Sequence, residues 1–214
     1  MNRAVFLDRD GVINAMVYNA EFGLIDSPAN PDEFEMLSGV IEAIRSINEM
    51  GFLAIVISNQ PGVAKGKFTI ELLEATKAKM VRELALGGAQ LDDVYYCLHH
   101  PHAMLDAYRV VCDCRKPKPG LLLQAAEKWD ISLPQSYFVG DGITDIVAGR
   151  NAGCKTFLVN SRKCYLCDEL ARQEVEPNYI GKDLADAVEA ISRLEKRDPI
   201  IEEQYRFRCK VICD

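Results

Sequence analysis

Two aspartates, Asp8 and Asp10, directly follow a run of apolar residues in the segment VFLDRDGVIN (residues 5–14). Carboxylates at this spacing raise each other's pKa unless a cation lies near them. Asp141 and Asp145 follow another short apolar run. If these runs are neighbouring strands, three or four carboxylates gather at one edge of a sheet. Mg²⁺, a hard ion that prefers oxygen ligands, would offset their repulsion, and the sequence therefore predicts a magnesium site.

The same edge could also hold a phosphoryl group. The hydroxyl of Ser58, backbone N–H groups near Asn59 and the ammonium of Lys116 could bind phosphate oxygens. Mg²⁺ together with a lysine is a recurring arrangement in phosphoryl transfer, where charge must be neutralised in the transition state. One carboxylate, Asp8, would attack phosphorus and form an aspartyl-phosphate. The other, Asp10, would protonate the leaving oxygen and then activate water.

Four residues in the middle of the chain form a second candidate metal site. Three thiols and one imidazole make a tetrahedral zinc set, which is structural when no coordination position is left open. The set is Cys97, His99, Cys112 and Cys114. Two nearby histidines could replace the histidine ligand: His100 and His102. Because the loop ends at Arg115 and Lys116, the zinc would orient these cations.

Three further cysteines carry weaker signals. Cys154 follows a glycine and is expected to be a small core residue. Cys164 and Cys167 form a CxxC pair, for which unpaired thiols are the favoured interpretation. A redox pair and a second zinc site remain alternatives.

These residues need a sheet to bring them together, and the pattern of the chain predicts one. Short apolar runs alternate with helical patterns, which indicates a doubly wound α/β fold with a mostly parallel sheet. The expected strands are residues 4–7, 52–58, 94–98, 137–140 and 156–159. The expected helices are residues 39–50, 69–86, 120–129, 143–152 and 184–194. In such sheets the ligand site lies at the carboxyl ends of the strands.

Strand alternation predicts that Arg9 points away from both aspartates, so that it is not the cation that offsets their charge. Gly11 is expected to allow a sharp turn after Asp10. Residues 21–34 are rich in turn formers and indicate a loop or a short hairpin.

We expect one domain over residues 1–195, with the zinc loop at about 97–114. Residues 196–214 would be a C-terminal extension, for which a strand, an arm and disorder all remain open. Only 50 residues separate the first aspartate motif from Ser58, which leaves no room for a large cap domain.

Composition limits the classes of partner. The 214 residues carry a net charge of −7 and no long basic block, which argues against a broad contact with nucleic acid. No apolar run is long enough to span a membrane, and the chain enters its first strand too early for a signal peptide. A cytoplasmic monomer that acts on a small phosphorylated molecule is the expectation.

Four segments in order resemble the motifs of the haloacid dehalogenase superfamily: DRDGVIN, SNQPGVAKGKFT, CRKPKPG and VGDGITDIVAGRNAG. Within it, YYCLHHP and VCDCRKPKPG are similar to the D-glycero-D-manno-heptose 1,7-bisphosphate phosphatases and the histidinol-phosphate phosphatases. The resemblance covers residues 3–160. It implies Asp8 as nucleophile, Asp10 as acid/base with its backbone carbonyl on Mg²⁺, and Asp141 as a further Mg²⁺ ligand. The phosphate and substrate contacts that it implies are Ser58, Asn59, Lys65, Arg115 and Lys116.

The resemblance favours a Mg²⁺-dependent phosphatase that removes the 7-phosphate of the heptose bisphosphate. Histidinol phosphate is the alternative substrate, and a non-catalytic binding module is the alternative class. Some positions depart from the family pattern. Gly142 stands where a basic residue is common, Pro61 where serine is common, and Lys65 where arginine is common. The segment 19–34 is longer than usual and lacks the usual Gly-Tyr pair. These departures bear on the substrate rather than on the chemistry.

Overall fold

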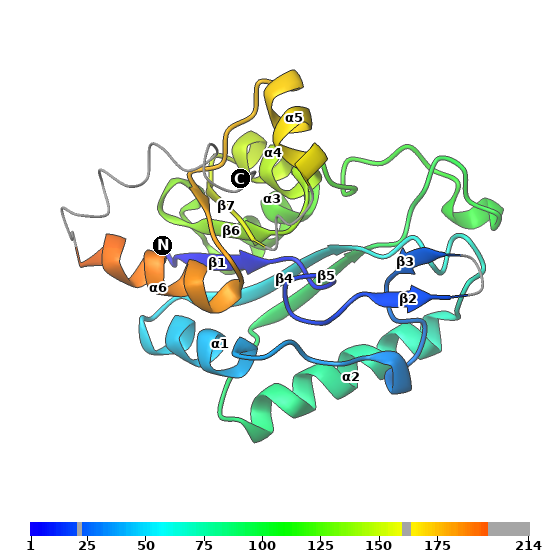
Figure 1. The fold of residues 1–214 in the computed structure, drawn as a ribbon, viewed down its shortest axis with the longest axis horizontal. Coiled ribbons are helices and arrows are strands. Elements are labelled where there is room, and N and C mark those ends of the chain that lie inside the picture. The colour runs from blue at the N-terminus through cyan, green and yellow to red at the C-terminus, as the bar shows by residue number, and fades with distance from the viewer. Residues whose placement is uncertain (21–22, 160–163, 197–214) are drawn as a thin grey trace.

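Six parallel strands form the central sheet of the computed structural model, in the order β5-β4-β1-β6-β7-β8 (Figure 1). The model describes the chain except for residues 21–22, 160–163 and 197–214. The strands are β1 (Ala4–Leu7), β4 (Leu53–Asn59), β5 (Asp93–Cys97), β6 (Tyr137–Gly140), β7 (Lys155–Leu158) and β8 (Tyr179–Ile180). The predicted doubly wound, mostly parallel α/β fold is confirmed.

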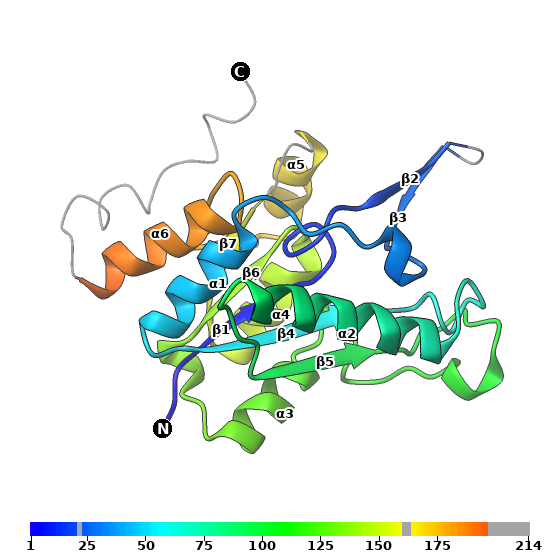
Figure 2. The same ribbon diagram turned by 90° about the horizontal axis from the view of Figure 1, so that it is seen from below.

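Helices cover both faces of the sheet (Figures 1 and 2). On one face lie α1 (Val40–Glu49), α2 (Ile70–Leu86) and α6 (Leu184–Glu195), and on the other lie α3 (Gly120–Trp129) and α4 (Ile143–Ala152). A further helix, α5 (Cys164–Arg172), packs against α4 through Leu166, Leu170 and Ile146.

The first strand shows why this sheet is buried on both faces. Val5 and Leu7 point into the core under α1 and α6, whereas Ala4 and Phe6 point into the core under α3 and α4. All four side chains are fully buried. Because side chains alternate along a strand, a continuous apolar run is what a doubly covered parallel strand requires.

The register of the sheet brings the carboxyl ends of three strands to one edge, where β4 continues to Asn59, beyond the partner of Leu7. Leu7, the last residue of β1, pairs with Val56 of β4 and with Val139 of β6. The backbone N–H of Asp8 then donates to the carbonyl of Val139 at 2.9 Å. The residues that follow these strands therefore start from one edge of the sheet.

Most predicted element boundaries agree with the structure to within one residue. Thr69 caps α2 by accepting from the N–H of Leu72, and Gly153 ends α4 in the left-handed conformation. Cys154 is buried, as predicted. The sequence did not predict α5 or β8. The side chains of Cys164 and Cys167, like the whole of the tail that carries Cys209 and Cys213, lie outside the described part of the chain.

The segment after β1 contains a two-stranded hairpin, β2 (Val17–Asn19) and β3 (Leu24–Asp26), followed by a 3-10 turn at Pro31–Glu33. The hairpin starts before the predicted range of 21–34, and the rest of that range is turn and loop. Two contacts tie this segment to the body of the protein. Lys67 forms an ion pair with Asp26, and Lys79 of α2 donates to the carbonyls of Pro31 and Phe34.

None of the described helices is both long and apolar enough to cross a membrane.

Asp93, at the start of the edge strand β5, contributes a pH-dependent part of the stability. Burial opposes its ionisation, but hydrogen bonds from Lys128 and Trp129 outweigh burial and lower the pKa of Asp93 to about 2. An unfolded aspartate has a pKa of about 3.9. The contribution is therefore complete above that pH and is lost as the pH falls towards 2.

Asp93→Asn should lower the free energy of unfolding at pH 7 by about 1 kcal/mol, because hydrogen bonds to a charged acceptor are lost. The difference from the parent should shrink as the pH is lowered from 5 to 2.5. Urea unfolding at several pH values measures both. Asp106→Asn, which changes an exposed aspartate paired with Arg109, is the control and should have little effect at any pH. An Asp93→Asn difference that stays constant with pH would contradict the assignment.

Candidate active site

Three carboxylates meet at the carboxyl edge of the sheet. Asp8 follows β1, Asp141 follows β6, and Asp145 lies in the first turn of α4. One carboxylate oxygen from each lies within 4.8 Å of the others. Oxygen ligands at this separation fit a hard divalent cation, because such an ion bridges several carboxylates and offsets their repulsion. Two of the three, Asp8 and Asp141, belong to the predicted magnesium set.

The ammonium of Lys116 lies inside this group of carboxylates. Its Nζ is 2.9 Å from Asp8 Oδ1 and 2.6 Å from Asp145 Oδ1, and it donates to the carbonyl of Ile57 at 2.9 Å. Burial opposes the charge on Lys116, but Asp145 and Asp8 outweigh burial and raise the pKa of Lys116. For Asp145, burial raises the pKa to about 6, because the charge of Lys116 offsets only part of the desolvation of the carboxylate. Lys116 is thus a fixed positive charge beside the predicted nucleophile.

Gly11 allows Asp141 to approach the chain that follows β1. Its φ of +84° is rare for residues with a side chain, and a Cβ at this position would lie 2.3 Å from Asp141 Oδ2. The predicted sharp turn is confirmed, and its consequence is space for a carboxylate.

Asp10 faces a different group of side chains from Asp8. Its carboxylate accepts from Asn14 at 3.0 Å and from Gln60 at 2.6 Å. It also pairs with the guanidinium of Arg9, whose Nη2 lies 3.0 Å from Asp10 Oδ1. The prediction that Arg9 points away from both aspartates was wrong for Asp10. The strand ends at Leu7, so alternation no longer sets the direction of Arg9, and its fully buried guanidinium folds back onto its neighbour.

Two consecutive predicted phosphate contacts at the end of β4 have different surroundings. Ser58 is buried, and its Oγ lies 3.1 Å from Gln60 Nε2. Asn59, in contrast, uses both ends of its amide on the backbone of Lys116. Its Nδ2 donates to the carbonyl of Lys116 at 3.1 Å, and its Oδ1 accepts from the N–H of Lys116 at 3.1 Å. This clamp attaches the loop that carries Lys116 to the sheet.

The two remaining predicted substrate contacts, Lys65 and Arg115, both lie near His100. Slight desolvation of His100, followed by the positive charges of Lys65 and Arg115, lowers the pKa of the His100 imidazole. Arg115 also donates to the carbonyl of His99 at 3.3 Å. A concentration of positive charge at this rim suits an anionic substrate.

The loop that carries Lys65 packs against the segment between His99 and Cys112. Ala64 accepts from the N–H groups of Met104 and Leu105 at 2.9 and 3.2 Å. The same loop contributes to a small cluster of apolar side chains, which we call the rim core and which shares Tyr96 with one of the two cores that cover the sheet. Its buried members are Val63, Phe68 and Leu73, and packed against them are Ala29, Ile70, Tyr96, Leu98 and Tyr108.

The predicted zinc ligands come together. One ligand atom from each of Cys97, His99, Cys112 and Cys114 lies within 4.8 Å of the others. The Sγ atom of Cys114 is 3.2 Å from those of Cys97 and Cys112, which are 3.7 Å apart, and 3.3 Å from His99 Nδ1. Tetrahedral zinc–sulfur bonds imply sulfur separations of about 3.8 Å. Burial raises the pKa of Cys97 and Cys114, so a cation is needed to make all three sulfurs thiolates.

The predicted site residues omit several side chains that shape this edge. Asp145 was expected among the carboxylates at this edge but was not named as a metal ligand, although it follows Asp141 by about one helical turn. Gln60 and Asn14 carry no comparable signal, since buried amides occur in many settings.

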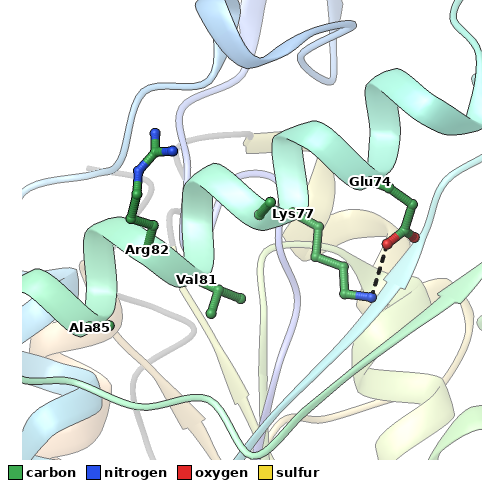
Figure 3. Close-up of a pocket in the computed structure, with 6 residues that line it drawn as sticks. Glu74, Lys77, Val81, Arg82 and Ala85 are labelled. Carbon is green, nitrogen blue, oxygen red and sulfur yellow. Dashed lines mark hydrogen bonds and ion pairs between the residues drawn. The ribbon is translucent and has the colours of Figure 1, made fainter.

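A shallow depression of about 360 Å³ lies elsewhere, on the outer side of α2 (Figure 3). All of its lining residues belong to that helix, and none belongs to the carboxylate or cysteine groups: Glu74, Lys77, Ala78, Val81, Arg82 and Ala85.

Comparison with known proteins gives consistent relatives. Residues 113–187 match the family model described as HAD-hydrolase-like. The chain is 37% identical over 195 residues to the D-glycero-β-D-manno-heptose-1,7-bisphosphate 7-phosphatase of Escherichia coli K12, covering 90% of this chain and 95% of that protein. It is 40% identical over 154 residues to the enzyme of the same name from Rhodopseudomonas palustris, covering 72% and 81%.

A solved structure agrees. The D,D-heptose 1,7-bisphosphate phosphatase from B. bronchiseptica, in complex with magnesium and phosphate, has a TM-score of 0.73 and 32% identity. The match covers 90% of this chain and 99% of that one.

The backbone clamp of Asn59 can be tested by removing its amide. Asn59→Leu leaves the N–H and carbonyl of Lys116 without partners in a partly buried place. The free energy of unfolding should fall by roughly 2–3 kcal/mol. Because Lys116 is then less well held, the affinity for inorganic phosphate in the presence of Mg²⁺ should fall about tenfold or more. Urea unfolding and isothermal titration calorimetry measure the two effects.

Asn48 supplies a matched control, since its amide makes the same pair of bonds to the backbone of Gln90 at 3.0 and 2.9 Å, away from the site. Asn48→Leu should lower stability but leave phosphate affinity unchanged. Equal losses of phosphate affinity in the two variants would show that the clamp has no specific effect on the site.

Proposed function

Because the chain belongs to the haloacid dehalogenase-like hydrolases, in the group of the heptose bisphosphate 7-phosphatases, it is a phosphoric monoester hydrolase, and we propose that it removes the 7-phosphate of D-glycero-D-manno-heptose 1,7-bisphosphate with the help of Mg²⁺. The observation that carries the chemistry is the contact between Asp8 and buried Lys116, with Asp10 held separately two residues on. The names of the relatives support the substrate.

The reaction takes two steps on the chain's own carboxyl groups. A carboxylate oxygen of Asp8 forms a bond to phosphorus while the bond from phosphorus to the sugar oxygen breaks. The leaving oxygen takes the proton of Asp10. Asp10, now a carboxylate, accepts a proton from water as the water oxygen attacks phosphorus. This second step releases phosphate and restores Asp8.

Other side chains neutralise and orient the phosphoryl group. Lys116 supplies a fixed positive charge, and the hydroxyl of buried Ser58 can donate to a phosphate oxygen. Asp8, Asp141 and the backbone carbonyl of Asp10 would hold Mg²⁺, with Asp145 nearby. When bound, Mg²⁺ supplies positive charge that offsets the carboxylates and the phosphoryl oxygens.

The rim would distinguish a bisphosphate from a monophosphate. Lys65 and Arg115 both lie close enough to His100 to lower its pKa, so their charges overlap in one place. A second phosphate on the substrate would benefit from both cations. Histidinol phosphate, with one phosphate and a cationic amine, would not.

Substitution of the two aspartates tests the reaction. Asp8→Asn should reduce kcat/KM by roughly 10³-fold or more, because no covalent intermediate can form. Asp10→Asn should reduce it by about 10²–10⁴-fold. Steady-state rates with both anomers of the heptose bisphosphate and with histidinol phosphate, all with Mg²⁺, give these values.

Acid quenching of the wild-type protein should trap phosphate on Asp8. Unchanged hydrolysis by Asp8→Asn would exclude this site, and faster turnover of histidinol phosphate than of either heptose anomer would exclude the proposed substrate.

We further propose that the cysteine group binds one structural zinc. Purified protein should contain about one zinc per chain, and Cys114→Ser should lower both the zinc content and the free energy of unfolding. Because the pinned segment contacts Ala64 and Arg115, chelation should also weaken the preference for a bisphosphate while leaving the Mg²⁺ requirement intact.

The matched control is Cys154→Ser, which changes a buried cysteine outside the group. This variant protein should retain its zinc. Metal analysis that finds no zinc in the parent protein would exclude the assignment.

A further inference from the structure

Gln60 lies between the predicted acid/base and the predicted phosphate contact. Its side chain is fully buried directly after β4. Its Nε2 lies 2.6 Å from Asp10 Oδ2 and 3.1 Å from Ser58 Oγ, so the two amide hydrogens go to two different oxygens. Its Oε1 accepts from Arg9 Nη2 at 3.0 Å.

Arg9 also supports Asp10 directly. Its Nε and Nη2 donate to Asp10 Oδ1 at 3.1 and 3.0 Å, and its guanidinium lies over the ring of Tyr96 at 5.5 Å. A fully buried guanidinium is costly unless it is paired, so it has few alternative positions. The Gln60 amide is therefore held by the Arg9 guanidinium, which is itself held in place.

The two hydrogen bonds of the Gln60 amide set the distance between the Asp10 carboxyl and the Ser58 hydroxyl. Because one –NH₂ group bonds both Asp10 and Ser58, the position of the Asp10 carboxyl is tied to that of the Ser58 hydroxyl. Ser58 marks the place of the phosphoryl group in the proposed function. The Gln60 amide thus holds the proton donor at a set position relative to the leaving oxygen.

We propose that Gln60, supported by Arg9, is a positioning residue that fixes the Asp10 carboxyl relative to the phosphoryl group. The inference rests on the proposed function, since it takes Asp10 as the donor to the leaving oxygen. When the bond from phosphorus to that oxygen breaks, its electron pair stays on the oxygen. An alkoxide leaving group must then take the proton of Asp10, whereas p-nitrophenolate is stable without it.

The test compares substrates with poor and good leaving groups. Gln60→Met removes the amide at similar volume. In a single turnover, it should lower the rate of leaving-group release from the heptose bisphosphate by about 10–100-fold and that of p-nitrophenol release by less than about threefold, because only this first step depends on the leaving group. Gln60→Glu keeps an acceptor for Arg9 and removes the amide donors. It should show the same selective loss if Gln60→Met folds poorly.

A matched control separates position from stability. Thr76→Val removes another buried polar group, a hydroxyl that donates to the carbonyl of Leu72 at 2.8 Å in α2. It should lower stability without any difference between the two substrates.

Asp10→Asn provides the reference for each outcome. If Asp10→Asn is selective and the Gln60 variants are not, the role of Gln60 is overturned while the proposed function stands. If Asp10→Asn slows leaving-group release equally from both substrates, the proposed role of Asp10 as proton donor fails, and the inference fails with it. Selective loss in both confirms the inference.

Discussion

The repulsion among three carboxylates at one edge of the sheet is the constraint on which the rest of the site depends. Two unit charges 4 Å apart interact by about 4 kcal/mol at an effective dielectric constant of 20, so Asp8, Asp141 and Asp145 cannot remain ionised together without a cation. Buried Lys116 supplies one positive charge, and the remaining imbalance makes the place suited to a divalent ion. Much of the local structure serves this balance. Asn59 attaches the backbone of Lys116 to β4, the first turn of α4 presents Asp145, and the bare backbone of Gly11 leaves room for Asp141.

The two aspartates after β1 differ because their surroundings differ. Asp8 lies beside an ammonium and two other carboxylates, an environment that suits the nucleophile of the proposed function. The carboxylate of Asp10 instead accepts from Arg9, Asn14 and Gln60, and it is not part of the group formed by Asp8, Asp141 and Asp145. A separation of two residues in sequence therefore becomes a separation between two electrostatic environments, as the proposed division into a nucleophile and an acid/base requires.

The sequence predicted the sheet well because doubly buried strands leave a strong signal. Runs such as residues 4–7 and 137–140 are apolar throughout, and the polar residues that end them must lie at one edge. The cysteine group was equally visible, since thiols and imidazoles at short spacing have few other uses. Contacts that depend on tertiary packing were not predictable. The direction of Arg9 follows from burial after the strand has ended. The bonds from Asn59 to the backbone of Lys116 join residues 57 positions apart, so the sequence alone could not indicate them. The short β8 strand and α5 lacked a long apolar pattern.

The rim core has a consequence for how such a protein can diverge. The hairpin segment, the loop that carries Lys65 and the cysteine-pinned segment pack on one another through Ala29, Val63 and Tyr108, whereas the carboxylates stand on the two cores under the sheet. Replacements in the rim core, other than at Tyr96, over which Arg9 lies, can thus be absorbed locally with little effect on the carboxylates. Descendants of one ancestor could keep the same reaction and exchange the molecule on which it is performed, by drift confined to three surface insertions.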